Sequence, residues 1–301
     1  MNMKVDLCGV TLNNPVMTAS GTFGSGAEYA EFVDLNKLGA VVTKGVANVP
    51  WPGNPTPRVA EVYGGMLNAV GLQNPGIDLF VERDIPFLKQ FDTKIMVNVC
   101  GHSTEEYIEV VERLRDQPVD LLEINISCPN VKEGGIAFGQ DPKAVEAITK
   151  EMKKHAAQPV IMKLSPNVTD ITEMARAAEA GGADGLSLIN TITGMKIDIN
   201  RQEFVLANKT GGMSGPAIHP VAVRMVYQTA QAVRLPIVGM GGIMNAEDAI
   251  EMILAGATAV SVGTANFTNP HVTEEIVAGI RDYMERYQVA DIKDLVGAVH
   301  E

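Results

Sequence analysis

The sequence is poor in the residues that mark disulfide-rich and zinc-binding proteins. It has three cysteines, Cys8, Cys100 and Cys128, at scattered positions. Disulfide frameworks use even numbers of cysteines, and zinc sites use closely spaced groups of them. We therefore expect free thiols, no metal site and a cytoplasmic protein.

Long apolar runs and clusters of basic residues are also missing. No apolar run reaches the roughly 18 residues that a membrane-spanning helix needs, and no charged segment followed by an apolar core opens the sequence. The 24 Lys and Arg are outnumbered by 36 Asp and Glu, which gives a net charge of −12. Because phosphate backbones are bound through clustered Lys and Arg, we expect neither nucleic acid nor a membrane as the partner.

Short segments rich in β-branched residues alternate with segments that have the 3.6-residue period of helices. The predicted strands are 16–20, 41–46, 95–99, 121–126, 160–164, 186–190, 237–240 and 260–262. The predicted helices include 104–114, 143–155, 171–180, 221–232, 246–255 and 274–287. Eight such repeats predict a (β/α)8 TIM barrel, with residues 1–301 as a single domain. A doubly wound open sheet is the competing arrangement.

Two connections are longer than ordinary βα loops. Residues 48–78 are rich in Pro and Gly, and residues 191–220 contain Gly-Gly-Met-Ser-Gly at 211–215. Long connections inside a compact domain are usually functional. We expect both to be insertions at the C-terminal face of the barrel.

Polar, small or ionisable residues stand at the C-terminal ends of all eight predicted strands. In order, they are Ser20-Gly21, Lys44-Gly45, Asn98, Asn125 with Cys128, Lys163, Asn190-Thr191, Gly241-Gly242 and Gly263-Thr264. Barrel enzymes take their catalytic groups from these positions. A single polar residue at a strand end has no special meaning, but eight together predict an active site.

The last two of these strand ends carry glycines, at the place where barrels commonly bind phosphate. Glycine has no side chain to keep an anion away from backbone N–H groups. Gly215 is a possible third donor. The pattern predicts a phosphorylated ligand.

Lys44 and Lys163 each follow an apolar strand. One alternative is an ordinary surface lysine at a strand end. A lysine that points into the barrel mouth is instead a Schiff-base nucleophile or a fixed cation beside an anion, and periodicity does not separate the last two. Cys128 lies on a polar loop just past a strand, where a thiol can act as acid or base. The following stretch, 132–139, resembles a lid with glycine hinges.

Several of these segments together resemble the class 1 dihydroorotate dehydrogenases. They are Asn-Ile-Ser-Cys-Pro-Asn at 125–130, the stretch 64–76, Thr-Lys-Gly at 43–45 and the glycine-rich 211–215. Cys128 is similar to class 1, since class 2 enzymes carry serine there. Segments 19–24 and 68–76 are most like the catalytic subunit of the two-subunit, NAD-linked type (class 1B). The stand-alone, fumarate-using type is the nearest alternative.

The resemblance implies a flavoprotein that oxidises (S)-dihydroorotate to orotate in de novo pyrimidine (UMP) biosynthesis. Cys128 would remove the C5 proton while hydride passes from C6 to FMN N5. The implied FMN-binding residues are Ser20, Lys44, Gly45, Asn98, Asn125, Lys163, Ile189, Gly215, Gly241, Gly242, Gly263 and Thr264. The implied substrate-binding residues are Lys44, Asn68, Ala69, Val70, Gly71, Leu72, Asn125, Asn190 and Thr191.

The resemblance also implies a partner subunit that carries FAD and a [2Fe–2S] cluster and reduces NAD. The chain has no four-cysteine pattern for such a cluster and no Gly-x-Gly-x-x-Gly at a strand end. We expect a homodimer of this chain inside a heterotetramer with two partners. Three further alternatives remain: a dihydropyrimidine dehydrogenase-like reductase, a flavin-free barrel lyase using Lys44 or Lys163, and a non-catalytic barrel scaffold.

Overall fold

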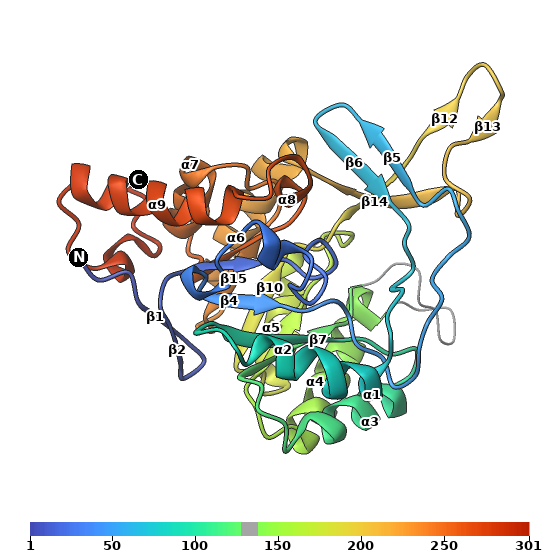
Figure 1. Ribbon diagram of the computed structural model, residues 1–301, viewed down its shortest axis with the longest axis horizontal. Helices are drawn as coiled ribbons and strands as arrows, with labels where there is room; N and C mark the ends of the chain where they lie inside the picture. Colours follow the sequence, from blue (N-terminus) through green and yellow to red (C-terminus); the bar gives the residue numbers. More distant parts are fainter. Residues whose placement is uncertain (128–137, 301) are drawn as a thin grey trace.

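Eight parallel strands close into a barrel in the computed structural model, which describes residues 1–127 and 138–300 (Figure 1). The ring runs β3–β4–β7–β8–β9–β10–β15–β16 and closes by pairing β16 with β3. The strands are β3 (Val16–Thr18), β4 (Ala40–Val42), β7 (Lys94–Val99), β8 (Leu121–Asn125), β9 (Val160–Lys163), β10 (Gly185–Leu188), β15 (Ile237–Met240) and β16 (Ala259–Val262). The predicted barrel is confirmed, and an open sheet is excluded.

A layer of helices surrounds the barrel. The longer ones are α3 (Thr104–Leu114), α4 (Pro142–His155), α5 (Ile171–Ala180), α6 (His219–Ala232), α7 (Ala246–Leu254) and α9 (Val272–Arg286). Side chains of Ser103, Asp141, Asp170 and Asn245 cap the N-termini of α3, α4, α5 and α7. Helix α6 begins two residues before the predicted start, because Pro220 fits its first turn.

The connections after β3 and β4 contain only short helices. These are η1 (Tyr29–Glu31), η2 (Leu35–Lys37), α1 (Ile77–Leu79), η3 (Phe80–Asp84) and α2 (Ile85–Leu88). Two more short elements, α8 (Ala265–Thr268) and η6 (Ile292–Leu295), lie near the C-terminus. The two short 3₁₀ turns η4 (Phe138–Gln140) and η5 (Pro216–Ile218) precede α4 and α6. The barrel is therefore covered by short turns over its first strands and by longer helices elsewhere.

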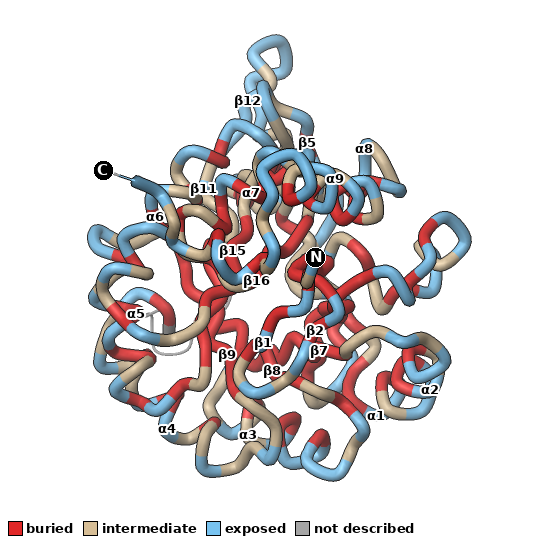
Figure 2. The backbone as a smooth tube through the Cα atoms, turned by 90° about the vertical axis from the view of Figure 1, so that its left-hand side faces the viewer, coloured by how far each residue is buried: buried red, intermediate tan, exposed pale blue. Residues whose placement is uncertain are grey.

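The barrel strands are buried on both faces, as expected of parallel strands enclosed by helices (Figure 2). One continuous cluster of buried apolar side chains includes residues from Met3 to Leu295. At the N-terminal end of the barrel lies a hairpin of β1 (Val5–Leu7) and β2 (Val10–Leu12), seen in front in Figure 2. This end is therefore covered, and the site must be sought at the other end.

Strand β4 ends at Val42, four residues before the end predicted from the sequence. The N–H of Lys44 donates to the carbonyl oxygen of Gly24 at 2.8 Å. The chain pairs with the neighbouring strand β7 again only at the bridge between Val46 and Val99. This departure from the strand brings Lys44 and Gly45 to the barrel mouth.

The two insertions pair with each other in an antiparallel sheet at the C-terminal end of the barrel, which we call the insertion sheet (Figure 1). Its order is β11 (Ile192–Met195), β14 (Thr210–Ser214), β6 (Gly65–Asn68) and β5 (Val59–Val62). A small hairpin of β12 (Ile197–Asp198) and β13 (Glu203–Phe204) projects beyond it. The insertions, predicted as separate long loops, therefore form one structural unit.

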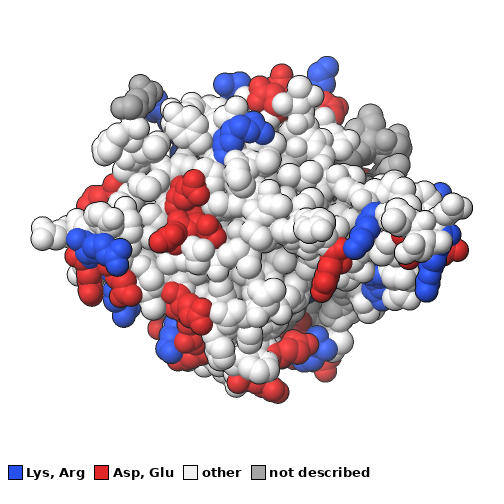
Figure 3. Space-filling model, turned by 90° about the horizontal axis from the view of Figure 1, so that it is seen from above, with Lys and Arg blue, Asp and Glu red and all other residues white. Residues whose placement is uncertain are grey.

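Charged side chains lie mostly around the margin of the face shown in Figure 3, where acidic and basic groups are intermixed. The described part of this face therefore offers mixed charge rather than a continuous basic surface. In the ranges 1–127 and 138–300, no helix is both long and apolar enough to cross a membrane.

Candidate active site

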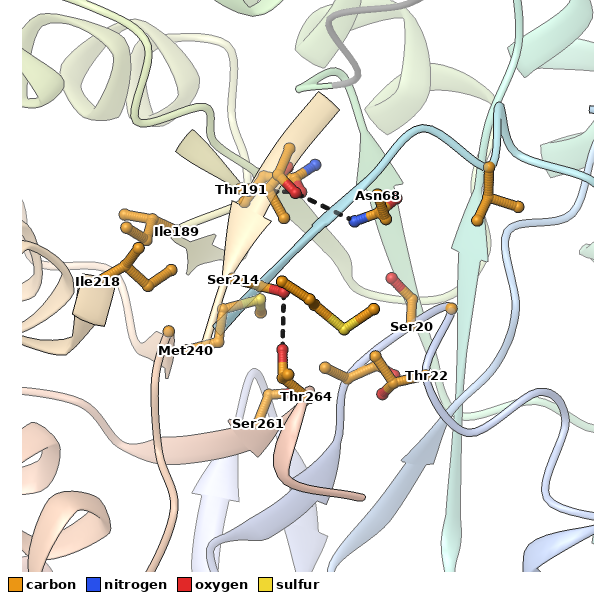
Figure 4. Close-up of a pocket in the computed structure, with 18 of the residues that line it drawn as sticks. Ser20, Thr22, Asn68, Ile189, Thr191, Ser214, Ile218, Met240, Ser261 and Thr264 are labelled. Carbon is orange, nitrogen blue, oxygen red and sulfur yellow. Dashed lines mark hydrogen bonds between the residues drawn. The ribbon is translucent and has the colours of Figure 1, made fainter. Parts of the chain in front are cut away.

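A cavity lies at the C-terminal end of the barrel, between the strand ends and the insertion sheet (Figure 4). Residues at or just after the ends of all eight barrel strands contribute to its wall. The insertion sheet adds Met66, Asn68, Gly212 and Ser214, and the loop after β6 adds Val70, Gly71 and Leu72. The positions predicted from strand ends thus meet around one space.

The predicted site residues within the described ranges line this cavity, apart from Ala69 and Gly215. Ala69 is buried, and its N–H donates to the carbonyl oxygen of Arg58 at 2.7 Å. Gly215 lies behind Gly242, since a Cβ added to Gly242 would lie 2.8 Å from the Gly215 carbonyl oxygen. Cys128 and the expected lid up to residue 137 lie outside the described residues, so their predicted roles are untested.

One end of the cavity has the features of a phosphate site. Gly241 and Gly242 have φ values of +129° and +69°, which favour glycine. The hydroxyls of Ser214 and Thr264 lie 2.7 Å apart beside the glycine turns (Figure 4). Glycine turns and hydroxyl donors of this kind fit a phosphate group.

Apolar side chains lie along the wall next to this end. Ile189, Ile218 and Met240 are grouped on the same side of the cavity (Figure 4). Such a wall suits a flat aromatic ring system, and together with the phosphate-type end it fits FMN.

Lys163 is a buried cation in the cavity wall, with 4% of its surface exposed. Its Nζ donates to the Ser20 hydroxyl at 3.1 Å and lies 3.6 Å from Oε2 of Glu123. Lys44 also lines the cavity. The site therefore offers two ammonium groups to an anionic or electron-rich ligand.

Three asparagines form the polar part of the wall. The Asn190 amide donates to the Ser127 hydroxyl at 2.6 Å, and that hydroxyl donates to Oδ1 of Asn125 at 2.9 Å. The Asn125 amide in turn donates to Oδ1 of Asn98 at 3.5 Å. The hydroxyl of Tyr107 donates to the Asn125 carbonyl oxygen at 2.7 Å and holds this strand end in place. Ordered amides of this kind can match a ring with alternating carbonyl and N–H groups.

The sequence reasoning missed several polar residues of the site. Ser127, Ser187 and Glu123 belong to the hydrogen-bonded wall or its support, while Thr22, Ser214 and Ser261 line the cavity. Glu123 lies in the strand Leu-Leu-Glu-Ile-Asn and is fully buried. An acidic residue within an apolar strand is itself a signal, because buried carboxylates are rare unless paired.

Comparison with known proteins agrees with the motif resemblance. The profile of the dihydroorotate dehydrogenase family matches residues 2–284. The dihydroorotate dehydrogenase B (NAD(+)) catalytic subunit of Lachnoclostridium phytofermentans is 72% identical over 299 residues, which cover 99% of this chain and 100% of that protein. The proteins of the same name from Alkaliphilus metalliredigens and Caldicellulosiruptor bescii are 65% and 53% identical, over 99% and 100% of both chains.

These matches extend over the whole barrel and both insertions. They confirm the resemblance to class 1 dihydroorotate dehydrogenases, and specifically to the catalytic subunits of the two-subunit, NAD-linked type. The chain therefore belongs to the dihydroorotate dehydrogenase family.

Proposed function

We propose that this chain is the FMN-containing catalytic subunit of an NAD-linked dihydroorotate dehydrogenase, which oxidises (S)-dihydroorotate to orotate in de novo pyrimidine biosynthesis. The observation that carries the proposal is the cavity itself. A phosphate-type end, a buried cation and ordered amides meet there, in a chain whose relatives of full length carry that name.

The residues of the cavity divide into two groups by chemistry. The glycine turns at Gly241, Gly242 and Gly263, with the hydroxyl of Thr264, would hold the FMN phosphate. Ile189 would pack on the ring, and Lys163 would stabilise negative charge that develops on it. The bound FMN supplies the hydride acceptor. The remaining proposed FMN contacts are Ser20, Lys44, Gly45, Asn98, Asn125 and, from behind the turn, Gly215.

The substrate would lie between the FMN site and the insertion sheet. Lys44 would pair with the orotate carboxylate, because ammonium–carboxylate pairs are strong hydrogen bonds. Asn68, Asn125 and Asn190 would match the amide edge of the ring. Ala69, Val70, Gly71, Leu72 and Thr191 would complete the pocket, with Ala69 acting through the backbone of its loop. Cys128 would remove the C5 proton on the face away from the flavin.

The electrons would then pass to a second protein. The names of the relatives describe a catalytic subunit, which implies another subunit in those enzymes. We propose a partner that carries FAD and a [2Fe–2S] cluster, in a heterotetramer built on a homodimer of this chain. The chain's three cysteines are too few for the four ligands that such a cluster usually has. The free thiol of Cys8 supports a cytoplasmic location, and the continuous core supports one domain of residues 1–301.

Purification and single-turnover kinetics test the activity. The purified chain is expected to be yellow, to release FMN on denaturation and to be bleached by dihydroorotate without oxygen. A colourless protein that takes up no FMN would refute the proposal. Reduction of fumarate without a partner would point to the stand-alone type, whereas co-purification of an FAD and iron–sulfur protein with NAD reduction supports the two-subunit type.

The role of Cys128 is tested by Cys128→Ser. A hydroxyl is a much weaker acid than a thiol, so flavin reduction should slow and its pH optimum should rise. Unchanged single-turnover kinetics across pH would remove Cys128 from the mechanism. Borohydride trapping of a substrate adduct on Lys44 or Lys163 would instead favour the flavin-free lyase.

A further inference from the structure

The hydrogen-bonded wall of the cavity continues below the asparagines to a buried carboxylate. The Asn98 amide donates to Oε2 of Glu123 at 2.5 Å, and the Ser187 hydroxyl donates to Oε1 at 2.7 Å. Glu123 is fully buried in β8, in register with Asn98 of β7. Its only charged contact among the described residues is Lys163, at 3.6 Å. Removing a carboxylate from water costs free energy of desolvation, so the presence of Glu123 at this buried position needs an explanation.

The carboxylate gives the chain of hydrogen bonds a direction. An ionised carboxylate only accepts, so Asn98 must turn its NH₂ group toward Glu123 and its oxygen toward Asn125. Asn125 then presents its NH₂ to Asn98 and its oxygen to Ser127. At the far end, the Thr191 N–H donates to Oδ1 of Asn190 at 2.7 Å, which is consistent with the same direction.

The same carboxylate faces the flavin lysine. Lys163 and Glu123 lie on neighbouring strands, and both are almost completely removed from water. In such surroundings an unbalanced charge acts strongly on its neighbours. Glu123 thus contacts the cation of the proposed FMN site directly, and it reaches the proposed substrate amide of Asn125 through Asn98.

We propose that Glu123 is a positioning residue that fixes the orientation of the Asn98 and Asn125 amides and balances the charge of Lys163. The inference rests on the proposed function, because it concerns the same cavity. A reversed amide would present a donor where the ring of the substrate also has one, and the match would be lost. Removal of the negative charge would leave a net positive charge near the flavin, which favours its reduced form.

Two variants separate these effects. In Glu123→Gln the carboxylate is replaced by an isosteric amide that can donate or accept. We expect orotate to bind about tenfold more weakly, as for loss of about one hydrogen bond, and the FMN reduction potential to become more positive. Glu123→Asp keeps the charge but is one methylene shorter. It should weaken orotate binding while the potential stays near that of the wild type.

Orotate affinity is measured from the change in flavin absorption on titration, and the potential by equilibration with a reference dye. Asp184→Asn is the matched control, because Asp184 also pairs with a lysine, Lys153, and lies before β10, at the opposite end of the barrel from the cavity. It should change neither quantity. If the role of Glu123 were merely structural, both variants would have lower melting temperatures. Orotate affinity and the FMN potential would then not respond differently in the two variants.

Unchanged orotate affinity and potential in a folded Glu123→Gln protein would overturn the inference. Should that variant not fold, Glu123→Asp alone decides, since wild-type affinity for orotate there would refute the orienting role. The wild type is the check on the proposed function. If it binds neither FMN nor orotate, the proposed function fails; if it binds both and the variants match it, only this inference fails.

Discussion

The imidazole of His219 ties the start of α6 to the turn after β15. Its Nδ1 lies 2.8 Å from the carbonyl oxygen of Gly241, and its Nε2 lies 3.1 Å from Oε2 of Glu251. Because a carbonyl oxygen only accepts, Nδ1 carries the hydrogen. His219 is largely buried, so the bond is shielded from water. The His219 side chain therefore supports the glycine turn proposed for phosphate binding, although His219 does not itself line the cavity.

His219→Leu should loosen this turn without changing any group that faces the cavity. Loss of one buried hydrogen bond predicts roughly tenfold weaker FMN binding. The measurement is fluorescence titration of the FMN-free protein with FMN. His155→Leu is the control, since His155 bonds to Glu112 on the outer surface. Equal affinities in both variants would show that His219 does not support the turn.

Gly242→Ala should abolish stable FMN binding. The new Cβ would lie 2.8 Å from the Gly215 carbonyl oxygen and 2.8 Å from the N and Cβ of His219. Gly182→Ala is matched for backbone conformation, with φ of +89° against +69°, but its Cβ meets only Lys153 at 3.9 Å. The left-handed backbone alone should cost each variant about 1 kcal/mol of stability. Gly242→Ala should lose more because of its close contacts, and only this variant should lose FMN. Retention of FMN by Gly242→Ala would contradict the assignment of the turn.

Lys163→Ala should impair both folding and FMN chemistry. It leaves Glu123 buried without its cation, which predicts a loss of about 3–5 kcal/mol in the free energy of unfolding. FMN retention or flavin reduction by dihydroorotate should fall as well, because the fixed cation is gone. Lys153→Ala removes a comparable but more exposed ion pair with Asp184 and should affect only stability. Full retention of FMN and of its reduction would contradict the role of Lys163.

Cys8 should resist alkylation at pH 8. Burial raises the pKa of its thiol to about 12, with Asp184 and Asp6 adding to the effect. The thiolate is the reactive form, so Cys8 should react with iodoacetamide at least about a hundredfold more slowly than a free thiol. Cys100 is fully buried and should also react slowly. Peptide mass spectrometry is expected to show Cys128 labelled first. Early labelling of Cys8 would contradict its raised pKa.

The same thiol makes stability fall at alkaline pH. Since the folded pKa lies above the ordinary value of 9.0, the folded state binds the proton more tightly than the unfolded state. The contribution of the protonated Cys8 thiol to the free energy of unfolding is complete below about pH 9 and is lost as the pH rises toward about 12. Denaturant titrations from pH 8 to 11 should show a smaller alkaline loss in Cys8→Ala than in the wild type. Parallel losses would rule out Cys8 as the group responsible.

The barrel and most of the cavity wall could be predicted from the sequence because both depend on local patterns. The apolar runs before Asn98 and Lys163 predict the strands. A polar residue at the C-terminal end of a barrel strand then lies at the barrel mouth, irrespective of the residues around it. The early end of β4 could not be predicted, since it depends on the bond from Lys44 to Gly24, twenty positions away. The acidic residue in an apolar strand marks Glu123 as unusual, but its role could not be predicted, because its partners Asn98 and Ser187 are 25 and 64 residues distant.

The insertion sheet sets the order in which the site can be assembled. Strand β6 pairs with β14, and Asn68 meets Gly212 across 144 positions of the chain. In a nascent chain that has released the first insertion from the ribosome, β6 can pair with β5, but its other edge has no partner strand until residues 210–214 follow. The glycine turns after β15 and β16 emerge later still. FMN therefore has no complete site on a partly synthesised chain, and cofactor loading is confined to the end of synthesis or after it.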